Sequence, residues 1–445
     1  MSYQYWGMNL MICVKISHSN IKNKIKDYLI YLFTLTALAV LMLSAFMITL
    51  LPSINKNADG EFASNSLPAI VSLVLFSLMI YMNRFMLKKQ SQELAIYMLS
   101  GIQKKHICFI YIYEHLLFGA IALVFGTLIG SIAIIFLENV YEANVSVQEF
   151  FLAIVQSVLF FSFAFILSVL FTVLAIPKMT IRGLMHLQNY NEKLNISRTL
   201  IWKYFIITIV SLRIIVLQVS FFNPFAASTI VLSIGLFLFF GYSALICYIQ
   251  YCREHRKKFF TKNKIVYLVG NFMSRIKTMI YMSTVISSCV VMIMVSFIAG
   301  WIFTHSQGIL FGDDGNDFIM GFMQFYIAIL FTLILFSIIA LQQIIDTKEH
   351  HNKLNVLRQL GANNSDINKL LLQQVIVNFT IPVLLAFVLL VVLIYPIHMQ
   401  LKEVITNTTL LAGASIFTCI FILLYGIYIV VTYISLKNLD NKIWN

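Results

Sequence analysis

Charged side chains are scarce in this sequence. Asp, Glu, Lys and Arg make up 11% of its 445 residues, against about 25% in ordinary soluble domains. Hydrophobic residues reach 60%, and the mean hydropathy is +0.88. A chain this apolar cannot shield its side chains from water, so its solvent must be a lipid bilayer and a soluble fold is excluded.

Several chemical motifs are also absent from the sequence. The six cysteines form neither a CxxC pair nor a Cys/His cluster with zinc spacing, so we expect free thiols and no metal site. No G-x-x-x-x-G-K-[ST] motif is present, so the chain itself cannot cradle ATP phosphates and any ATP must be bound by a partner subunit. A serine elbow, an H-E-x-x-H motif and a pair of intramembrane aspartates are all missing. We therefore predict no cofactor and no enzyme activity in this chain.

Ten apolar runs meet or approach the length of about 20 residues that a membrane-spanning helix needs. They cover 28–51, 69–87, 107–137, 151–176, 200–222, 226–251, 279–303, 319–345, 368–397 and 408–436. The first run lacks a signal-peptide cleavage pattern and is expected to be retained as a helix. With short connections between the runs, the sequence predicts an all-α, polytopic membrane protein with ten transmembrane helices.

The basic residues indicate the orientation of these spans. With the N-terminus inside, every Lys and Arg lies on the cytoplasmic side except Lys56, Lys402 and Arg213. This asymmetry predicts a protein of the cell membrane with both termini in the cytoplasm. It also accounts for the net charge of +13 without nucleic acid. The outer segments carry nine acids, which are Asp59, Glu61, Glu138, Glu142, Glu149, Asp313, Asp314, Asp317 and Glu403.

A self-similarity at an offset of 260 residues is the most informative pattern in the chain. The matched pairs are Leu94 and Leu354, Gly101 and Gly361, Ile107 and Ile367, and Glu114 and Gln374. Upstream, 19–22 resembles 274–277 at a slightly smaller offset. Spans 1–4 and 7–10 are therefore predicted to be two copies of one four-helix unit. Because four is an even number, both copies cross the membrane in the same direction.

This repeat predicts three regions along the chain. Residues 1–190 form the first four-helix repeat with an N-terminal amphipathic segment, 191–258 form a central two-helix hairpin, and 259–445 form the second repeat with its own amphipathic lead-in. In each repeat, the polar loop after the second span is expected to be a short amphipathic helix at the cytoplasmic surface, ended by a glycine with positive φ. One such helix could be a simple interfacial element, whereas two on the same side suggest a platform for a symmetric cytoplasmic dimer.

The pattern of these loops resembles a known family. Basic residues precede Glu93-Leu94, Gly101 follows seven positions after Leu94, and Glu114 lies early in the next span. This arrangement is similar to the FtsX-like permeases of ABC transporters, especially the bacitracin-export and antimicrobial-peptide-resistance branch, and the resemblance covers nearly the whole chain. It implies ten spans in a 4+2+4 order and a separate ATPase dimer docked on the two loops. The implied ATPase-coupling residues are Lys88, Lys89, Glu93, Leu94, Gly101, Lys104, Lys105, Lys353, Leu354 and Gly361.

The sequence departs from the family pattern in two respects. Lys353 stands at the position of Glu93 and Gln374 at that of Glu114, so equal roles for the two halves are not expected. Permeases of that branch usually carry a large extracellular domain between spans 7 and 8, but here this connection is only about 304–318. Either the chain is a reduced relative, or its substrate is handled without such a domain, and we then expect the substrate to be met within the bilayer.

Few polar groups lie inside the predicted spans. Glu114 is expected to anchor the loop helix to the span, to relay motion, or to be a wetted interfacial carboxylate. Arg213 is expected to pair with a carboxylate, to bind backbone carbonyls or to snorkel outward. Gly119, Gly126 and Gly130 form a small-residue seam on the third span, which permits close helix packing.

Two function hypotheses follow from these patterns. The first is a permease subunit that couples an ATPase, in two copies per chain, to export or removal of an amphipathic peptide of the antimicrobial or bacteriocin kind, or of a lipid-linked substrate. The acidic outer segments, with Glu138, Glu142, Asp313, Asp314 and Asp317, would concentrate cationic peptides. The second is a non-transporting signalling or scaffold protein that controls a sensor kinase or a cell-wall enzyme.

Overall fold

The computed structural model is helical and falls into two compact units. It describes residues 15, 17–21, 25–50, 58–141, 146–178, 180–186, 197–220, 226–255, 270, 276–306, 314–359, 361, 363–402 and 404–442. One unit comprises Met1–Asn189 with Leu333–Leu341, and the other comprises Tyr190–Thr332 with Gln342–Asn445. Within the described residues, ten helices are long and apolar enough to cross a membrane, in agreement with the ten predicted spans.

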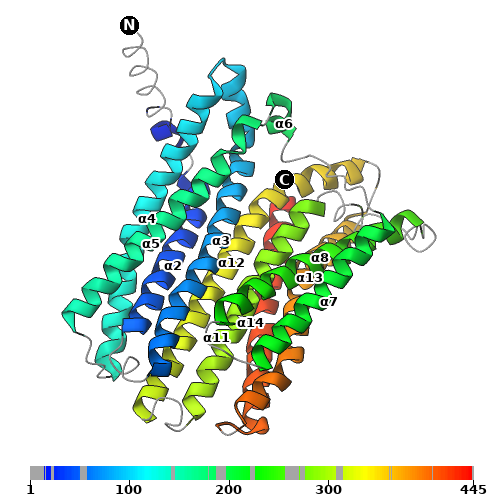
Figure 1. The fold of residues 1–445 in the computed structure, drawn as a ribbon. Coiled ribbons are helices and arrows are strands. Elements are labelled where there is room, and N and C mark those ends of the chain that lie inside the picture. The colour runs from blue at the N-terminus through cyan, green and yellow to red at the C-terminus, as the bar shows by residue number, and fades with distance from the viewer. Residues whose placement is uncertain are drawn as a thin grey trace. The chain divides into compact units, whose positions relative to one another are not determined.

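The first unit contains the first four spans. Its elements are α2 (Ile25–Leu50), α3 (Ala58–Leu99), α4 (Lys104–Tyr141), α5 (Val147–Val173), a short 3-10 helix η1 (Ile176–Lys178) and α6 (Ile181–His186). The helices α2 to α5 run alongside one another, with α2 packed against α3, α4 and α5 (Figure 1). The α2 side chains are therefore the most completely buried of the unit, and most positions from Tyr31 to Met47 are covered. In the membrane, α2 is the central helix of this bundle.

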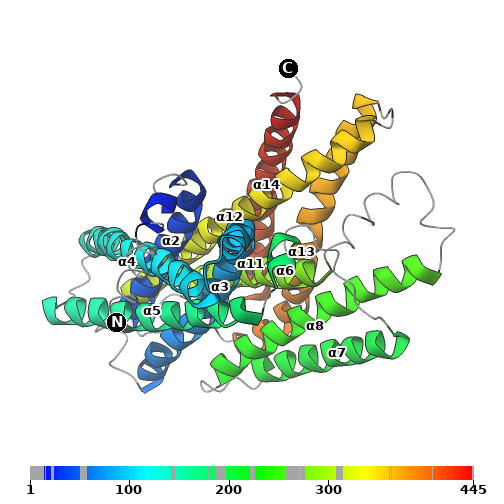
Figure 2. The same ribbon diagram turned by 90° about the horizontal axis from the view of Figure 1, so that it is seen from above.

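The second unit contains the remaining spans. Its elements are α7 (Arg198–Ser220), α8 (Ala226–His255), α11 (Ile276–His305), α12 (Asp314–Gln359), α13 (Asn364–Gln400) and α14 (Asn407–Lys442). The central pair α7 and α8 lie side by side (Figure 2), and α13 packs against α7, α8, α11 and α14. The α12 stretch Leu333–Leu341 groups with the first unit, where Ser337 shares a 2.6 Å hydrogen bond with Thr34 of α2.

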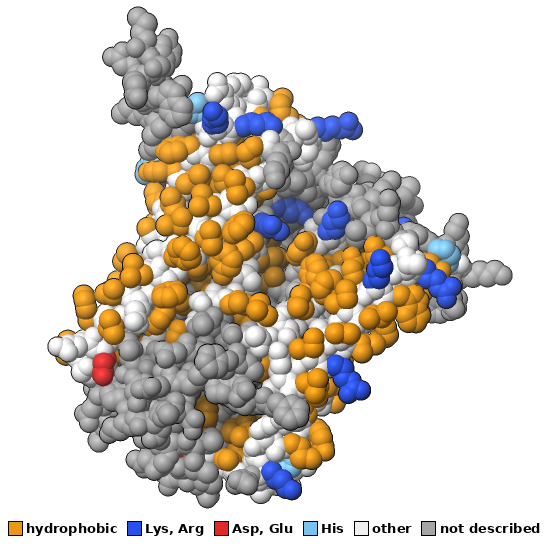
Figure 3. All heavy atoms as spheres, in the orientation of Figure 1, with side chains coloured by type: hydrophobic (Ala, Val, Ile, Leu, Met, Phe, Trp, Pro, Cys, Tyr) orange, Lys and Arg blue, Asp and Glu red, His pale blue; other side chains and the backbone are white. Residues whose placement is uncertain are grey.

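The outward faces of the helices are strongly apolar. On α7, Ser211 and Ile215 are the buried side chains, and large residues such as Trp202, Phe205 and Leu217 are exposed. Hydrophobic side chains cover broad areas of the described surface in Figure 3. In a soluble protein such patches would drive aggregation, so these faces are the surfaces that contact lipid.

Small residues set the closest approach between helices of the first unit. A Cβ added at Gly126 would overlap the Cβ of Ala39, and one at Gly130 would lie 2.8 Å from Leu43 Cδ2, so both glycines face α2. A Cβ at Gly119 would overlap the ring of Phe165 on α5. The glycine seam of α4 thus permits close packing on two neighbours, as predicted from its spacing.

Candidate functional site

The candidate site is the corner where α3 ends and α4 begins, which we call the first corner (residues 94–111 with η1). Gly101 has φ 86°, a conformation that glycine adopts without steric cost. The Ile102 amide donates to the Tyr97 carbonyl at 3.1 Å and the Gly101 amide to the Met98 carbonyl at 3.2 Å. These two bonds form a Schellman motif, so the predicted glycine cap is confirmed.

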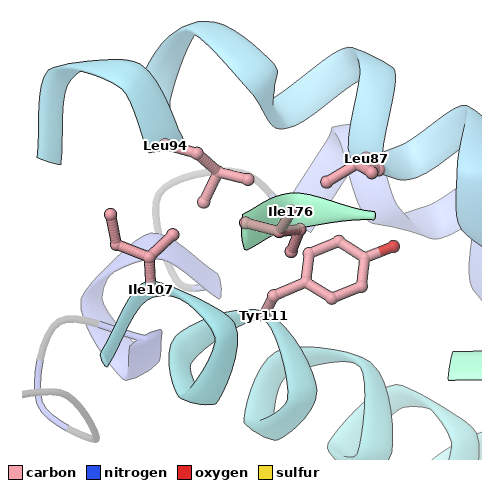
Figure 4. Close-up of a cluster of buried hydrophobic side chains, with 5 residues drawn as sticks. All are labelled: Leu87, Leu94, Ile107, Tyr111 and Ile176. Atoms are coloured by element: carbon pink, nitrogen blue, oxygen red, sulfur yellow. The ribbon is translucent and has the colours of Figure 1, made fainter. Parts of the chain in front are cut away.

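The first corner is held by a small hydrophobic core. Leu87 and Leu94 of α3, Ile107 and Tyr111 of α4, and Ile176 of η1 pack together, each no more than 3% exposed (Figure 4). At the surface, Lys104 joins the start of α4 to η1, because its Nζ donates to the Pro177 carbonyl at 2.9 Å. The chain that leaves α5 is thereby fastened to the turn between α3 and α4.

The structure corrects one expectation about this loop. The predicted short helix on the cytoplasmic surface is instead the end of α3, which continues unbroken from Ala58 to Leu99. The same holds in the second repeat, where α12 runs from Asp314 to Gln359. No glycine or proline interrupts 88–99, so nothing in the local sequence ends the helix before Gly101.

The predicted coupling residues of the first corner divide into two groups. Leu94 is buried in the core of the corner and is a packing residue, not a surface contact. Lys88, Lys89 and Glu93 are half-buried, whereas Lys104 and Lys105 are exposed. The sequence analysis missed Ile96 and Leu99, which are 55% and 61% exposed on the last turn of α3. Ile96 and Leu99 are three residues apart and lie on a different side of α3 from Leu94. This helical spacing could have indicated a second apolar face.

Glu114 is the centre of a buried hydrogen-bond network. Its Oε2 accepts from the Tyr28 hydroxyl at 2.8 Å and from Gln90 Nε2 at 3.1 Å, and its Oε1 accepts from Asn20 Nδ2 at 3.1 Å. Gln90 also donates to the Tyr28 hydroxyl. Asn20 and Tyr97 exchange hydrogen bonds of 2.8 and 3.0 Å. Glu114 is 3% exposed, so it is not the wetted interfacial carboxylate that the sequence left open. Its hydrogen bonds join α4 to residues 17–21, α2 and α3.

A second polar chain crosses the same unit deeper in the bundle. The Tyr31 hydroxyl donates to Asn83 Oδ1 at 2.6 Å, and Asn83 Nδ2 donates to Ser168 Oγ at 2.8 Å. The Tyr111 hydroxyl donates to the Asn83 carbonyl at 2.7 Å. Because lipid offers no competing partner, such contacts hold helices together within a membrane. None of these residues was predicted, since nothing in the local sequence pairs them.

The second corner, at residues 354–371, repeats the geometry of the first. Gly361 has φ 89°, and Ile367 and Leu371 form a buried pair against Tyr433. These are the positions of Gly101, Ile107, Tyr111 and Val173 shifted by 260. Gln343 Nε2 also donates to Thr432 Oγ1 at 2.7 Å, joining α12 to α14 as the bond from Asn83 joins α3 to α5. The repeat therefore extends from sequence to side-chain packing.

The remaining predicted residues of the second corner are placed in less detail. Lys353 and Leu354 lie on α12, but their side chains fall outside the described part of the structure. Gln374 is buried on α13 at 6% exposure, at the position that matches Glu114. The two halves thus bury different chemistry at equivalent sites.

Two other predicted polar groups lie apart from the corners. Arg213 is exposed on α7 among apolar neighbours, which agrees with an arginine that extends along the lipid-facing surface. Asp317 was expected in an exposed acidic loop, and this expectation is wrong. It lies in the first turn of α12 at 2% exposure and accepts a hydrogen bond from the buried Ser306 hydroxyl, because the first turn of α12 packs against the end of α11.

The other outer acids are helical or outside the described residues. Glu138 and Asp314 belong to α4 and α12, with side chains outside the description, and Glu142 and Asp313 are not among the described residues. In the described part of the chain, no group of three His, Cys, Asp or Glu residues is arranged to hold a metal ion.

Comparisons with known proteins agree with the architecture of the two corners. The family model described as FtsX-like permease C-terminal matches residues 65–182 and again 325–441. The two matches begin 260 residues apart and cover more than half of the chain.

A curated relative supports the same assignment. The chain is 24% identical over 221 residues to the bacitracin export permease protein BceB of Halalkalibacterium halodurans. This match covers 46% of the chain and 32% of that protein, so the chain matches about a third of its relative's length. With two family matches, each spanning one corner and its flanking helices, the chain belongs to the FtsX-like permease family.

Proposed function

We propose that this chain is the membrane subunit of an ABC transporter and that a separate ATPase dimer docks on its two corners. The observation that carries the proposal is the duplication of one corner, in which Gly101 and Gly361 both have positive φ and the same packing positions recur 260 residues apart. Two equivalent sites in one chain suit a partner with two-fold symmetry. The expected stoichiometry is one permease to two ATPase subunits.

The surface of the first corner suits a protein partner. Ile96 and Leu99 expose apolar area at the end of α3, and Lys105 exposes a cation at the start of α4. In Figure 3, basic side chains of the first unit gather toward this end. An apolar contact rimmed by positive charge fits an ATPase groove with an apolar floor and acidic edges. The orientation with both termini inside, which we also propose, places both corners in the cytoplasm with the ATPase.

Co-purification tests this assignment. The permease should carry an ATPase through detergent extraction in a ratio of one to two, measured by native mass spectrometry. Replacing Ile96 and Leu99 with serine should release the ATPase. The matched control replaces Leu128 and Ile129, which are equally exposed on the lipid-facing side of α4, and should leave the complex intact. Purification without any ATPase, from cells that express every ATPase of the host, would refute the proposal.

For the substrate, we propose an amphipathic antimicrobial peptide, bacteriocin-like in character, that the permease meets within the bilayer. BceB, to which the chain is similar, is named for bacitracin export. The apolar helix faces suit a membrane-inserted peptide, and the outer acids other than Asp317 would raise its local concentration if it is cationic.

Deleting the gene tests the substrate class. Resistance to at least one such peptide should fall in the deletion strain and return with the wild-type chain. Unchanged resistance across a broad peptide panel, with altered cell separation or kinase output, would instead support a signalling protein.

A further inference from the structure

We propose that Asn20, Tyr97 and Glu114 are positioning residues that fasten the N-terminal helical segment (residues 17–21) to the first corner. Because of these contacts, the first corner stays fixed when the ATPase dimer closes, and the second corner moves. The fastening stands on contacts within the first unit. Its consequence for movement rests on the proposed function.

The fastening joins segments that are far apart in the sequence. The bonds of Asn20 span 77 residues to Tyr97 and 94 residues to Glu114, and the bond from Tyr28 to Glu114 spans 86. Gln90 adds the last turns of α3 to the same carboxylate. Four separate parts of the chain therefore meet at one buried side chain. Tyr97 is also the residue whose carbonyl accepts the bond that closes the Gly101 cap, so the network reaches the corner itself.

The strength of the network comes from its donors and its burial, since all three neighbouring side chains donate to the Glu114 oxygens, as an ionised carboxylate requires. A carboxylate that accepts several hydrogen bonds binds each donor more strongly than a neutral oxygen does. Glu114 and Tyr28 are each 3% exposed, so water does not replace the bonds when they stretch. Moving the corner away from residues 17–21 would leave the carboxylate buried and under-bonded, which is unfavourable. The first corner is therefore expected to resist displacement.

The second repeat lacks the side chains for the same network. At an offset of 260, Glu114 becomes Gln374, Tyr97 becomes Leu357 and Gln90 becomes His350. Leu357 has no hydroxyl and Gln374 has no charge, so a charged acceptor and its tyrosine partner are both missing. The packing of the corner is kept, with Ile367, Leu371 and Tyr433 in place. Duplication thus preserved the packing of the corner but not the Glu and Tyr side chains of this network.

Distances between paired spin labels test the fastening directly in the full-length protein. One pair is placed at His18 and Leu99, both exposed, across the first corner. A matched pair is placed at Lys277 and Gln359, both exposed, in the second unit. We expect a narrow distance distribution for the first pair and a broader one for the second. Tyr97→Phe and Glu114→Gln should broaden the first distribution alone, whereas Tyr113→Phe, an equally conservative change on α4, should broaden neither.

The outcome separates positioning from general stability. If Glu114→Gln fails to fold, Tyr97→Phe still decides, because Tyr97 is half-buried at the surface of the network. If the distance distribution of the His18 and Leu99 pair stays narrow in both variants, the fastening is overturned. If the two label pairs give equally wide distributions in the wild-type protein, the difference between the corners is overturned. These measurements need no ATPase, so failure of the proposed function is recognised independently by the absence of the complex.

The complex provides a second readout. For Tyr97→Phe, the ratio of peptide protection in cells to ATP hydrolysis in the purified complex should fall about tenfold, as expected for loss of about 1.4 kcal/mol of coupling. A thiol crosslinker that joins cysteines at His18 and Ser100 should restore coupling in the Tyr97→Phe background. If the crosslinked protein remains uncoupled, the role of Tyr97 is not positioning.

Discussion

Glu114 is the residue whose replacement is expected to matter most. Glutamine keeps the shape of Glu114 but loses the charge that strengthens the bonds from Tyr28, Gln90 and Asn20. We expect Glu114→Gln to destabilise the first unit by about 1–2 kcal/mol. The effect is not larger, because measured energies of hydrogen bonds between membrane helices are smaller than the burial of the partners suggests. Thermal unfolding of the purified protein measures this, and peptide protection in cells measures its functional effect.

The matched control is Gln374→Glu in the second repeat. Gln374 is also buried, so the new carboxyl group can stay neutral or find partners in place of the amide, and we expect function to be retained. Equal loss of function in both variants would mean that any change at this depth is harmful. Equal indifference would remove Glu114 from the coupling mechanism.

The glycines of α4 permit a second test at the residue scale. Gly126→Ala should destabilise the protein by about 1–3 kcal/mol, because its Cβ would overlap Ala39 of α2 and lie 3.1 Å from the Thr36 carbonyl oxygen. Gly235→Ala on α8 is the matched control, since no atom lies within 4 Å of the added Cβ. The control should stabilise by about 0.5–1 kcal/mol through helix propensity. Unfolding midpoints of the two variants are expected to shift in opposite directions.

At the scale of the element, the end of α3 depends on Gly101. A Cβ at this position meets nothing within 4 Å, so the effect of a substitution comes from the positive φ alone. Gly101→Val should cost about 1–2 kcal/mol and distort the corner while the protein still inserts into the membrane. ATP hydrolysis in the complex should then be uncoupled from peptide protection.

Gly101→Asn serves as the control for this element. Asparagine tolerates the left-handed conformation better than other residues with a side chain, so coupling should be largely kept. Full coupling in Gly101→Val would show that the cap is not needed for transmission. Loss of insertion in both variants would show that the cap acts earlier, in folding.

The continuous α3 and α12 change how a corner can move. A separate surface helix could tilt independently, but α3 runs unbroken from Ala58 to Leu99 and α12 from Asp314 to Gln359. Any displacement of a corner is therefore carried into the bilayer by the same helix. This rigid connection is why the fastening of one corner, and not of the other, has consequences for the movement of whole helices.

At the scale of the whole molecule, the orientation in the membrane is open to a direct test. A cysteine at Val147, which is 84% exposed at the start of α5, should react with an impermeant maleimide applied to intact cells. A cysteine at Lys105, exposed at the first corner, should react only after the membrane is opened. The physical reason is the cytoplasmic excess of Lys and Arg. Reaction of the Lys105 position from outside would reverse the topology and remove both corners from the cytoplasm.

The sequence alone determined the spans, the repeat and the two capping glycines. A bilayer requires about 20 apolar residues per helix, so the spans are visible in composition. A helix that ends in a left-handed residue selects glycine, so Gly101 and Gly361 mark the corners without any knowledge of the fold. The offset of 260 follows from duplication and is read from the residues directly.

The tertiary structure decided which polar groups meet. Asn20, Tyr28 and Gln90 surround Glu114 from three other parts of the chain, and no local period records a contact across 94 residues. It also placed Asp317 against Ser306 within the protein, where charge patterning had suggested an exposed loop. Composition and spacing describe how each helix meets lipid and water. The contacts between distant segments depend on which faces of the helices are turned toward one another, and only packing sets that.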